Sequence, residues 1–125
     1  MVIVEDDSDA VQTLRMALEM EGHSVVTAED GSSGLDTIRK TQPDAAIVDI
    51  GLPGLNGYQI AQRLCAEDSP VFLIALTGYG TLADYNRAKS AGFNAHLTKP
   101  ADLSQLTELI ATLRDQPSNV PSRVR

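Results

Sequence analysis

Five short apolar runs alternate with five amphipathic stretches along this chain, and this alternation constrains the fold more than any other feature. The predicted strands are the runs 2–4, 25–28, 45–48, 71–76 and 95–98. Three of these runs, V-I-V, A-A-I-V and V-F-L-I-A-L, are continuously apolar rather than alternating. Continuous apolar runs are typical of parallel strands whose two faces are both covered.

The stretches between the runs have helical spacing and recognisable ends. The predicted helices span 8–21, 32–41, 57–67, 82–91 and 103–113. Gly22 and Gly92 suit the left-handed position that closes a helix. Asn56 and Asp102 suit the N-cap position of the third and fifth helices. A strict strand–helix order predicts an α/β fold with a doubly wound parallel sheet and right-handed crossovers.

Composition narrows the class of protein. The chain has 125 residues, room for one domain, and 42% are hydrophobic and 22% charged, which argues against a disordered chain. No apolar run approaches the roughly 18–20 residues of a membrane span, and the first residues do not resemble a signal peptide. We therefore expect a cytoplasmic protein without membrane contact. A single cysteine, Cys65, allows neither an internal disulfide nor a cysteine-based metal site.

The charge distribution argues against direct binding of nucleic acid. The formal net charge is −7, and residues 1–36 hold nine of the 17 acidic residues but one basic residue, Arg15. Such a surface repels a phosphate backbone. Aromatic residues make up 4% of the chain and tryptophan is absent, so stacking platforms for bases are also lacking.

The last residues differ from the rest of the chain. After Leu113 the segment D-Q-P-S-N-V-P-S-R-V-R has no periodicity. We expect one domain over residues 1–114 and a disordered tail or linker remnant over 115–125. Because the first strand starts almost at Met1, we also expect that the domain was excised from a longer protein.

Polar side chains stand where four of the predicted strands end. Glu5 and Asp6 follow the first strand, Asp49 the third, Thr77 the fourth and Lys99 the fifth. In doubly wound sheets the ligand binds outside the carboxyl ends of the strands, so we expect these groups to share one crevice. Clustered carboxylates without His or Cys favour Mg²⁺. With a phosphoryl group present, Asp49 could attack phosphorus while the other groups stabilise the developing charge.

Each of these residues also has a simpler explanation when taken alone. The acids at 5–7 could cap the first helix, Asp49 could be a loop residue, Thr77 a turn residue and Lys99 a solvated charge. The occurrence of all of them at the same sheet edge favours the functional interpretation.

Four motifs resemble the receiver domain of two-component response regulators. They are V-I-V-E-D-D, A-I-V-D-I-G-L-P-G-L-N-G, A-L-T-G and H-L-T-K-P, in family-like order and spacing, and the resemblance covers residues 1 to about 114. It implies a flavodoxin-like (βα)5 three-layer sandwich with a parallel five-stranded sheet of order 2-1-3-4-5. It also implies a phosphoprotein of signal transduction rather than an enzyme with a separate substrate.

The resemblance implies a role for each residue of the metal site. Asp49 matches the phosphoacceptor, which also binds Mg²⁺ and becomes an aspartyl phosphate. Asp6 matches the carboxylate that binds Mg²⁺ directly, and Glu5 matches a companion acid that acts mostly through water. Gly51 would contribute its backbone carbonyl to the metal.

The resemblance also implies switch residues. Thr77 matches the switch hydroxyl, Lys99 matches the lysine that contacts the phosphoryl group, and the Lys99–Pro100 peptide bond is typically cis in the family. His96 stands where the family usually has Tyr or Phe, whose ring swings inward on activation. A switch role for His96 and a simple exposed strand-end histidine both stay open. Because Gly51 has no side chain and Tyr79 could shield the phosphoryl group, the phosphoryl lifetime is not predicted.

The predicted function is transfer of a phosphoryl group to Asp49 from the phosphohistidine of a histidine kinase or histidine phosphotransfer domain. Phosphorylation would then change the surface formed by the fourth helix, fifth strand and fifth helix. The motifs look most like receivers fused to hybrid sensor histidine kinases, and a free-standing regulator is the alternative. A phosphate-independent interaction module is the second hypothesis. An aspartate-nucleophile phosphatase would need a D-x-D motif directly after the first strand, where the acids of this chain are consecutive. A flavin protein would need aromatic and Ser/Thr-rich loops, which are missing.

Overall fold

A computed structural model describes residues 1–52, 54–78, 81–99 and 103–115 of the chain. The predicted N-cap Asp102 lies outside these residues. Five strands form one parallel sheet in the order β2-β1-β3-β4-β5, which is the flavodoxin-like order expected from the sequence. The strands are β1 (Val2–Val4), β2 (Val26–Ala28), β3 (Ala45–Asp49), β4 (Phe72–Thr77) and β5 (Ala95–Thr98).

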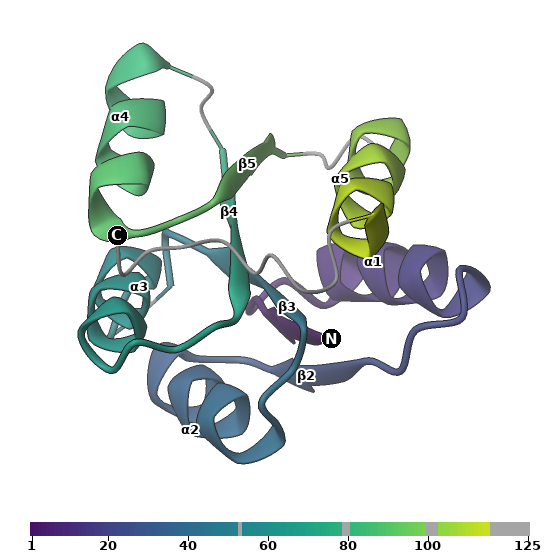
Figure 1. Ribbon diagram of the computed structural model, residues 1–125, viewed down its shortest axis with the longest axis horizontal. Helices are drawn as coiled ribbons and strands as arrows, with labels where there is room; N and C mark the ends of the chain where they lie inside the picture. The colour runs from purple at the N-terminus through teal and green to yellow at the C-terminus, as the bar shows by residue number, and fades with distance from the viewer. Residues whose placement is uncertain (53, 79–80, 100–102, 116–125) are drawn as a thin grey trace.

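Helices cover both faces of the sheet, as Figure 1 shows. They are α1 (Ser8–Met20), α2 (Gly31–Thr41), α3 (Gly57–Ala66), α4 (Leu82–Ala91) and α5 (Leu103–Asp115). Helices α1 and α5 lie on one face, and α2, α3 and α4 lie on the other. None of the helices in the described residues combines the length and apolar character needed to cross a membrane.

Successive residues of the central strands contribute to opposite halves of the core. Ile3 and Ile47 belong to the cluster under α1 and α5, whereas Val4 and Val48 belong to the cluster under α2 and α3. Each of these four side chains is fully buried. This double coverage explains why the runs are continuously apolar in the sequence.

Strands β3 and β4 extend one residue beyond the predicted apolar runs. They end at Asp49 and Thr77, which therefore belong to the strands rather than to the following loops. Asp49 pairs with Leu76, and the N–H of Ile50 donates to the Leu76 carbonyl at 3.1 Å. The backbone ladder continues because it depends on N–H and C=O groups and not on side-chain polarity. Both polar side chains are thereby fixed by the sheet.

Several predicted helix ends are confirmed. Asn56 caps α3 in a capping box with Gln59, where each side chain accepts a hydrogen bond from the other residue's N–H. Gly22 follows α1 with φ +88°, and Gly92 closes α4 with φ +116°. Both glycines occupy the left-handed region in which other residues are strained.

The start of α2 lies against the loop that precedes α3. A Cβ on Gly31 would lie 1.7 Å from the backbone oxygen of Leu55, far inside the contact distance of any two atoms. The absence of a side chain at Gly31 thus lets the loop between β3 and α3 close over the end of the sheet.

We predict that Gly31→Ala lowers the free energy of unfolding by about 1–3 kcal/mol, because the obstacle is backbone and cannot rotate away. Urea unfolding followed by circular dichroism measures this change. The matched control is Gly78→Ala, since no atom of the described residues lies within 4 Å of the added Cβ and Gly78 has no positive φ. Equal unfolding midpoints for the two variants would contradict the prediction.

Candidate functional site

A lysine and two buried carboxylates meet at the carboxyl edge of the sheet. Lys99 Nζ, just after β5, lies 2.7 Å from Glu5 Oε1 and 2.8 Å from Asp49 Oδ2. Glu5 and Asp49 are 1% and 5% exposed, so the two carboxylates are shielded from water, whereas the Lys99 side chain is 31% exposed. The strand ends that the sequence analysis places at one crevice are therefore in direct contact.

The remaining carboxylate oxygens are held by backbone N–H groups. Glu5 Oε2 accepts from the N–H of Asp6 at 2.9 Å and of Asp7 at 3.3 Å. Asp49 Oδ1 accepts from the N–H of Gly51 at 2.8 Å. Each carboxylate is thus oriented by one ammonium contact and by the backbone of its own loop. The direct contact of Glu5 with Lys99 is not predicted from the sequence, where Glu5 is expected to act mostly through water.

The two carboxylates differ in acidity. Burial raises the pKa of Glu5 to about 7, and the neighbouring Asp49 carboxylate adds to this effect while Lys99 opposes it. Burial also raises the pKa of Asp49, but hydrogen bonds with Glu5 and Lys99 outweigh burial and leave that pKa below its ordinary value. Burial lowers the pKa of Lys99, and the two ion pairs outweigh it and leave that pKa above the ordinary value. Asp49 and Lys99 are therefore ionised at neutral pH, and Glu5 is the proton-sharing member.

The acid cluster fits a hard cation. One carboxylate oxygen from each of Glu5, Asp6 and Asp49 lies within 4.8 Å of the other two. Asp6 is exposed, so the cluster opens to solvent on its side. All three ligand atoms are oxygens, the donor type that Mg²⁺ prefers. The residues present therefore suit a magnesium ion that keeps several of its waters.

Asp7 has a structural role instead. Its side chain accepts a hydrogen bond from the N–H of Asp9 at 3.0 Å and so caps the N-terminus of α1. Of the consecutive acids 5–7, the first two belong to the cluster and the third is the N-cap. The simpler explanation of the acidic stretch thus holds for one residue of the three.

Thr77 and Gly51 lie next to the cluster. Thr77 is 2% exposed at the end of β4, and its carbonyl accepts from the N–H of Lys99 at 2.7 Å. Gly51 contributes its N–H to Asp49, whereas the role of its carbonyl at a metal stays a prediction. Pro100 and Tyr79, with their predicted cis bond and shielding role, lie outside the described residues.

His96 is separate from the cluster. It lies on β5, and its ring packs edge-on against Tyr85 of α4, with centroids 5.7 Å apart and planes at 81°. The residue is half-buried, and its Nε2 is buried without a hydrogen-bond partner among the described residues. The histidine is therefore less exposed than a simple strand-end residue, and its switch role stays a prediction.

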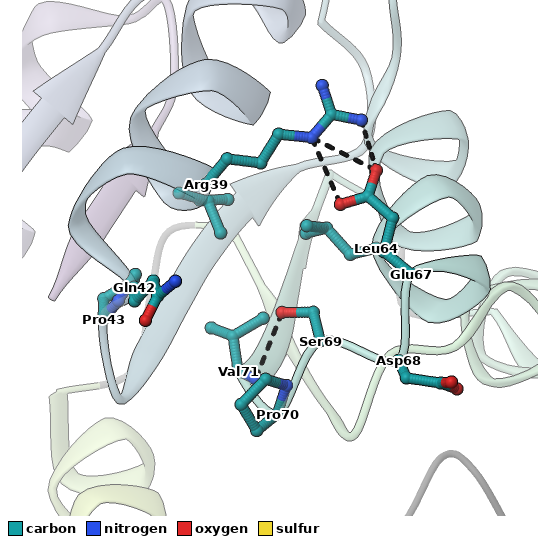
Figure 2. A pocket seen from close by; sticks show the side chains of 10 residues that line it. Arg39, Gln42, Pro43, Leu64, Glu67, Asp68, Ser69, Pro70 and Val71 are labelled. Carbon is teal, nitrogen blue, oxygen red and sulfur yellow. Dashed lines mark hydrogen bonds and ion pairs between the residues drawn. The ribbon is translucent and has the colours of Figure 1, made fainter.

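A different hollow lies at the opposite edge of the sheet. This cavity has a volume of about 250 Å³ and lies between the ends of α2 and α3. Figure 2 shows the side chains that line it. An ion pair spans it, since Arg39 Nε donates to Glu67 Oε2 at 3.1 Å. Both side chains are more than one-third exposed, so the pair contributes little to stability. The cavity contains none of the predicted site residues.

Comparison with known proteins establishes the family. The family model of the response regulator receiver domain matches residues 1–111. The chain belongs to the response regulator receiver family. The cluster of Glu5, Asp6, Asp49 and Lys99 accordingly lies at the strand ends of a receiver domain.

The relatives of this receiver domain differ in length. It is 36% identical over 111 residues to protein PilH of Pseudomonas aeruginosa, covering 87% of this chain and 92% of that protein. It is 33% identical over 112 residues to the transcriptional regulatory protein PrrA of Mycobacterium leprae, covering 90% of this chain and 48% of that protein. The chain thus spans about half the length of several curated relatives that it matches.

The fold is also that of solved receivers. The CheY-like response regulator receiver domain protein of Methanospirillum hungatei superposes with a TM-score of 0.84 at 28% identity. The alignment covers 94% of this chain and 95% of that one.

The raised pKa of Glu5 predicts how stability depends on pH. In the native receiver domain Glu5 keeps its proton up to about pH 7, whereas an unfolded glutamate loses it near pH 4.5. The native state binds more protons in this window, so stability falls as pH rises through it. In Mg²⁺-free buffer we expect the parent to lose about 1–3 kcal/mol relative to Glu5→Gln between pH 5 and pH 8.

Urea unfolding of both proteins at each pH measures this difference, and the glutamine variant cancels the contribution of titrating groups that do not contact Glu5. Repeating the series with Mg²⁺ should reduce the loss, because a cation favours the ionised carboxylate. If the difference in free energy of unfolding between the parent and Glu5→Gln stays constant from pH 5 to pH 8, the pKa of Glu5 is not raised in the native state.

Proposed function

We propose that this receiver domain accepts a phosphoryl group on Asp49 from the phosphohistidine of a histidine kinase or histidine phosphotransfer domain. The observation that carries the proposal is the contact of the ionised Asp49 carboxylate with Lys99 Nζ at 2.8 Å. The carboxylates of Glu5 and Asp6 lie at the same edge of the sheet. A carboxylate nucleophile beside a fixed cation suits attack on a phosphoryl group.

The transfer is a single displacement at phosphorus. A carboxylate oxygen of Asp49 forms the new P–O bond, the P–N bond of the donor breaks, and its electron pair returns to the imidazole. The low pKa of Asp49 keeps the nucleophile ionised, and the Lys99 ammonium stabilises negative charge on the phosphoryl oxygens. Thr77 ends the adjacent strand and could donate its hydroxyl to the same oxygens.

Glu5, Asp6 and Asp49 would hold Mg²⁺, together with the Gly51 carbonyl. When bound, the ion supplies charge neutralisation between the acids and the incoming phosphoryl group. The support for this set is the 4.8 Å clustering of the three carboxylates. Glu5 would give up its shared proton when the cation binds, since ligands bind hard cations in ionised form.

Phosphorylation would alter the face formed by α4, β5 and α5. Thr77 ends β4, one residue from the loop to α4, and His96 contacts α4 through Tyr85. A new charge at Asp49 that draws in Thr77 would therefore reach this face. A swing of the His96 ring is part of this proposal.

The wider context is also proposed. Several relatives are named as regulatory proteins or response regulators, and the domain would modify itself rather than a separate substrate. It would act in the cytoplasm, where it would meet its phosphodonor, without direct contact with nucleic acid. The domain would span residues 1–114 with a tail over 115–125. Fusion to a sensor kinase and a free-standing regulator are both compatible with the motifs.

The decisive experiment is incubation with acetyl phosphate followed by intact mass measurement. We expect a phosphate-sized gain that requires Mg²⁺ and is absent in Asp49→Asn, because the amide cannot act as the nucleophile. Asp7→Asn is the matched control, since it removes a neighbouring acid while asparagine caps a helix equally well. It should gain phosphate like the parent.

A gain that persists in Asp49→Asn would contradict the proposed nucleophile. If the parent neither gains mass nor binds beryllofluoride, a stable mimic of the phosphoryl group, the phosphate-independent interaction module becomes the better explanation.

A further inference from the structure

Arg87 of α4 stacks on Tyr58 of α3. The guanidinium carbon of Arg87 lies 4.1 Å from the centroid of the Tyr58 ring. A guanidinium at this distance is attracted by the negative face of an aromatic ring. Tyr58 is only 7% exposed, and its hydroxyl is buried without a hydrogen-bond partner among the described residues. The ring is therefore fixed by packing and presents its face to Arg87.

Helix α4 buries no large side chain among its described residues. Its buried side chains are Ala88 and Ala91, while Leu82 is 74% exposed and Tyr85 46%. Alanine buries little apolar surface, so its contribution to docking is small. The other helices bury larger side chains, such as Leu14 and Leu18 of α1. The contact of Arg87 with Tyr58, beside the contact of Tyr85 with His96, therefore helps to hold α4 in place.

Tyr58 is in turn connected to the phosphoacceptor. It follows Gly57, where an added Cβ would lie 2.6 Å from Ile50 Cα and 2.7 Å from the carbonyl oxygen of Asp49. The first turn of α3 therefore rests directly on the backbone of Asp49. A change in the position of the Asp49 loop and a change in the position of α4 both act on this turn.

The chain itself provides a second connection. Strand β4 ends at Thr77, and α4 begins five residues later at Leu82. A displacement of Thr77 toward a group on Asp49 pulls on the segment that leads into α4. The stacking of Arg87 on Tyr58 opposes this pull because it holds α4 against α3.

We propose that Arg87 is a positioning residue that clamps α4 to Tyr58 and thereby limits how readily the site takes up a phosphoryl group. The inference rests on the proposed function, since the coupled ligand is the phosphoryl group on Asp49. A ligand that favours the displaced arrangement must overcome the clamp, so weakening the clamp raises its apparent affinity.

The test compares beryllofluoride affinity, with Mg²⁺ present, among the parent, Arg87→Ala, Arg87→Lys and Lys89→Ala. We expect Arg87→Ala to bind about two- to fivefold more tightly, the shift that one exposed cation–π contact can supply. Arg87→Lys keeps a cation but loses the planar guanidinium that stacks on the ring, so its affinity should lie between those of the parent and Arg87→Ala. Lys89→Ala removes the same charge from the same helix, away from Tyr58, and should leave the affinity unchanged.

A pair of substitutions at the ring completes the test. Tyr58→Phe keeps the aromatic face and should bind like the parent, whereas Tyr58→Leu should match Arg87→Ala. The double variant of Arg87→Ala and Tyr58→Leu should bind no more tightly than either single variant, because both remove one contact. Amide hydrogen exchange should become faster in α4 and stay unchanged in α2 in the Arg87→Ala protein.

Two failures are distinguishable. If the parent binds beryllofluoride but Arg87→Ala and Lys89→Ala have equal affinities, the clamp is wrong and the proposed function stands. An affinity of Arg87→Ala below the parent would also overturn the clamp. If the parent itself binds no beryllofluoride, the proposed function fails and this inference fails with it.

Discussion

The ion pairs of Lys99 with Glu5 and Asp49 are the interaction on which the site depends. Two carboxylates that are almost fully buried cannot both ionise beside each other without a cation, because the low local dielectric amplifies their repulsion. The parallel sheet brings the strand ends together, and Lys99 after β5 supplies the charge that makes their proximity tolerable. The parallel arrangement of the strands therefore forms the apolar core and also brings Glu5, Asp49 and Lys99 together at the carboxyl edge of the sheet.

The carboxyl groups of Glu5 and Asp49 differ in pKa, and this difference suits the proposed transfer of a phosphoryl group to Asp49. Both carboxylates contact Lys99 and accept backbone N–H groups, and burial raises the pKa of both, but the hydrogen bond between them lowers the pKa of Asp49 and raises that of Glu5. Glu5 is the more deeply buried acid, and its pKa is raised to about 7. The proton that the pair shares therefore resides on Glu5, and Asp49 stays a nucleophile. The position of this proton thus makes Asp49, and not Glu5, the nucleophile of the pair.

Much of this arrangement is predictable from the sequence, because it depends on the pattern of apolar residues and on the order of the strands along the chain. Continuous apolar runs identify covered parallel strands, and the carboxyl ends of parallel strands converge, so the proximity of Asp49 and Lys99 follows from the order of the runs alone. The extra residues of β3 and β4 do not follow from it, because backbone pairing continues past the apolar side chains. Within the acids 5–7, hydrophobic pattern alone cannot separate the N-cap Asp7 from its neighbours, since capping depends on local backbone geometry. The stacking of Arg87 on Tyr58 has no sequence signal at all, because it depends on how two helices sit relative to each other.

Two rings that contact α4 carry buried polar atoms without a protein partner among the described residues. Apart from Glu5 Oε1, which pairs with Lys99, the buried side-chain atoms without a hydrogen-bond partner in the described residues are Tyr58 Oη and His96 Nε2. Both belong to rings that contact α4, one through Arg87 and the other through Tyr85. Helix α4 buries Ala88 and Ala91, whereas α1 buries Leu14 and Leu18, so a displacement of α4 breaks less apolar contact than a displacement of α1. A fold arranged in this way can respond to a charge change at Asp49 by moving α4 while the tightly packed strands stay in place.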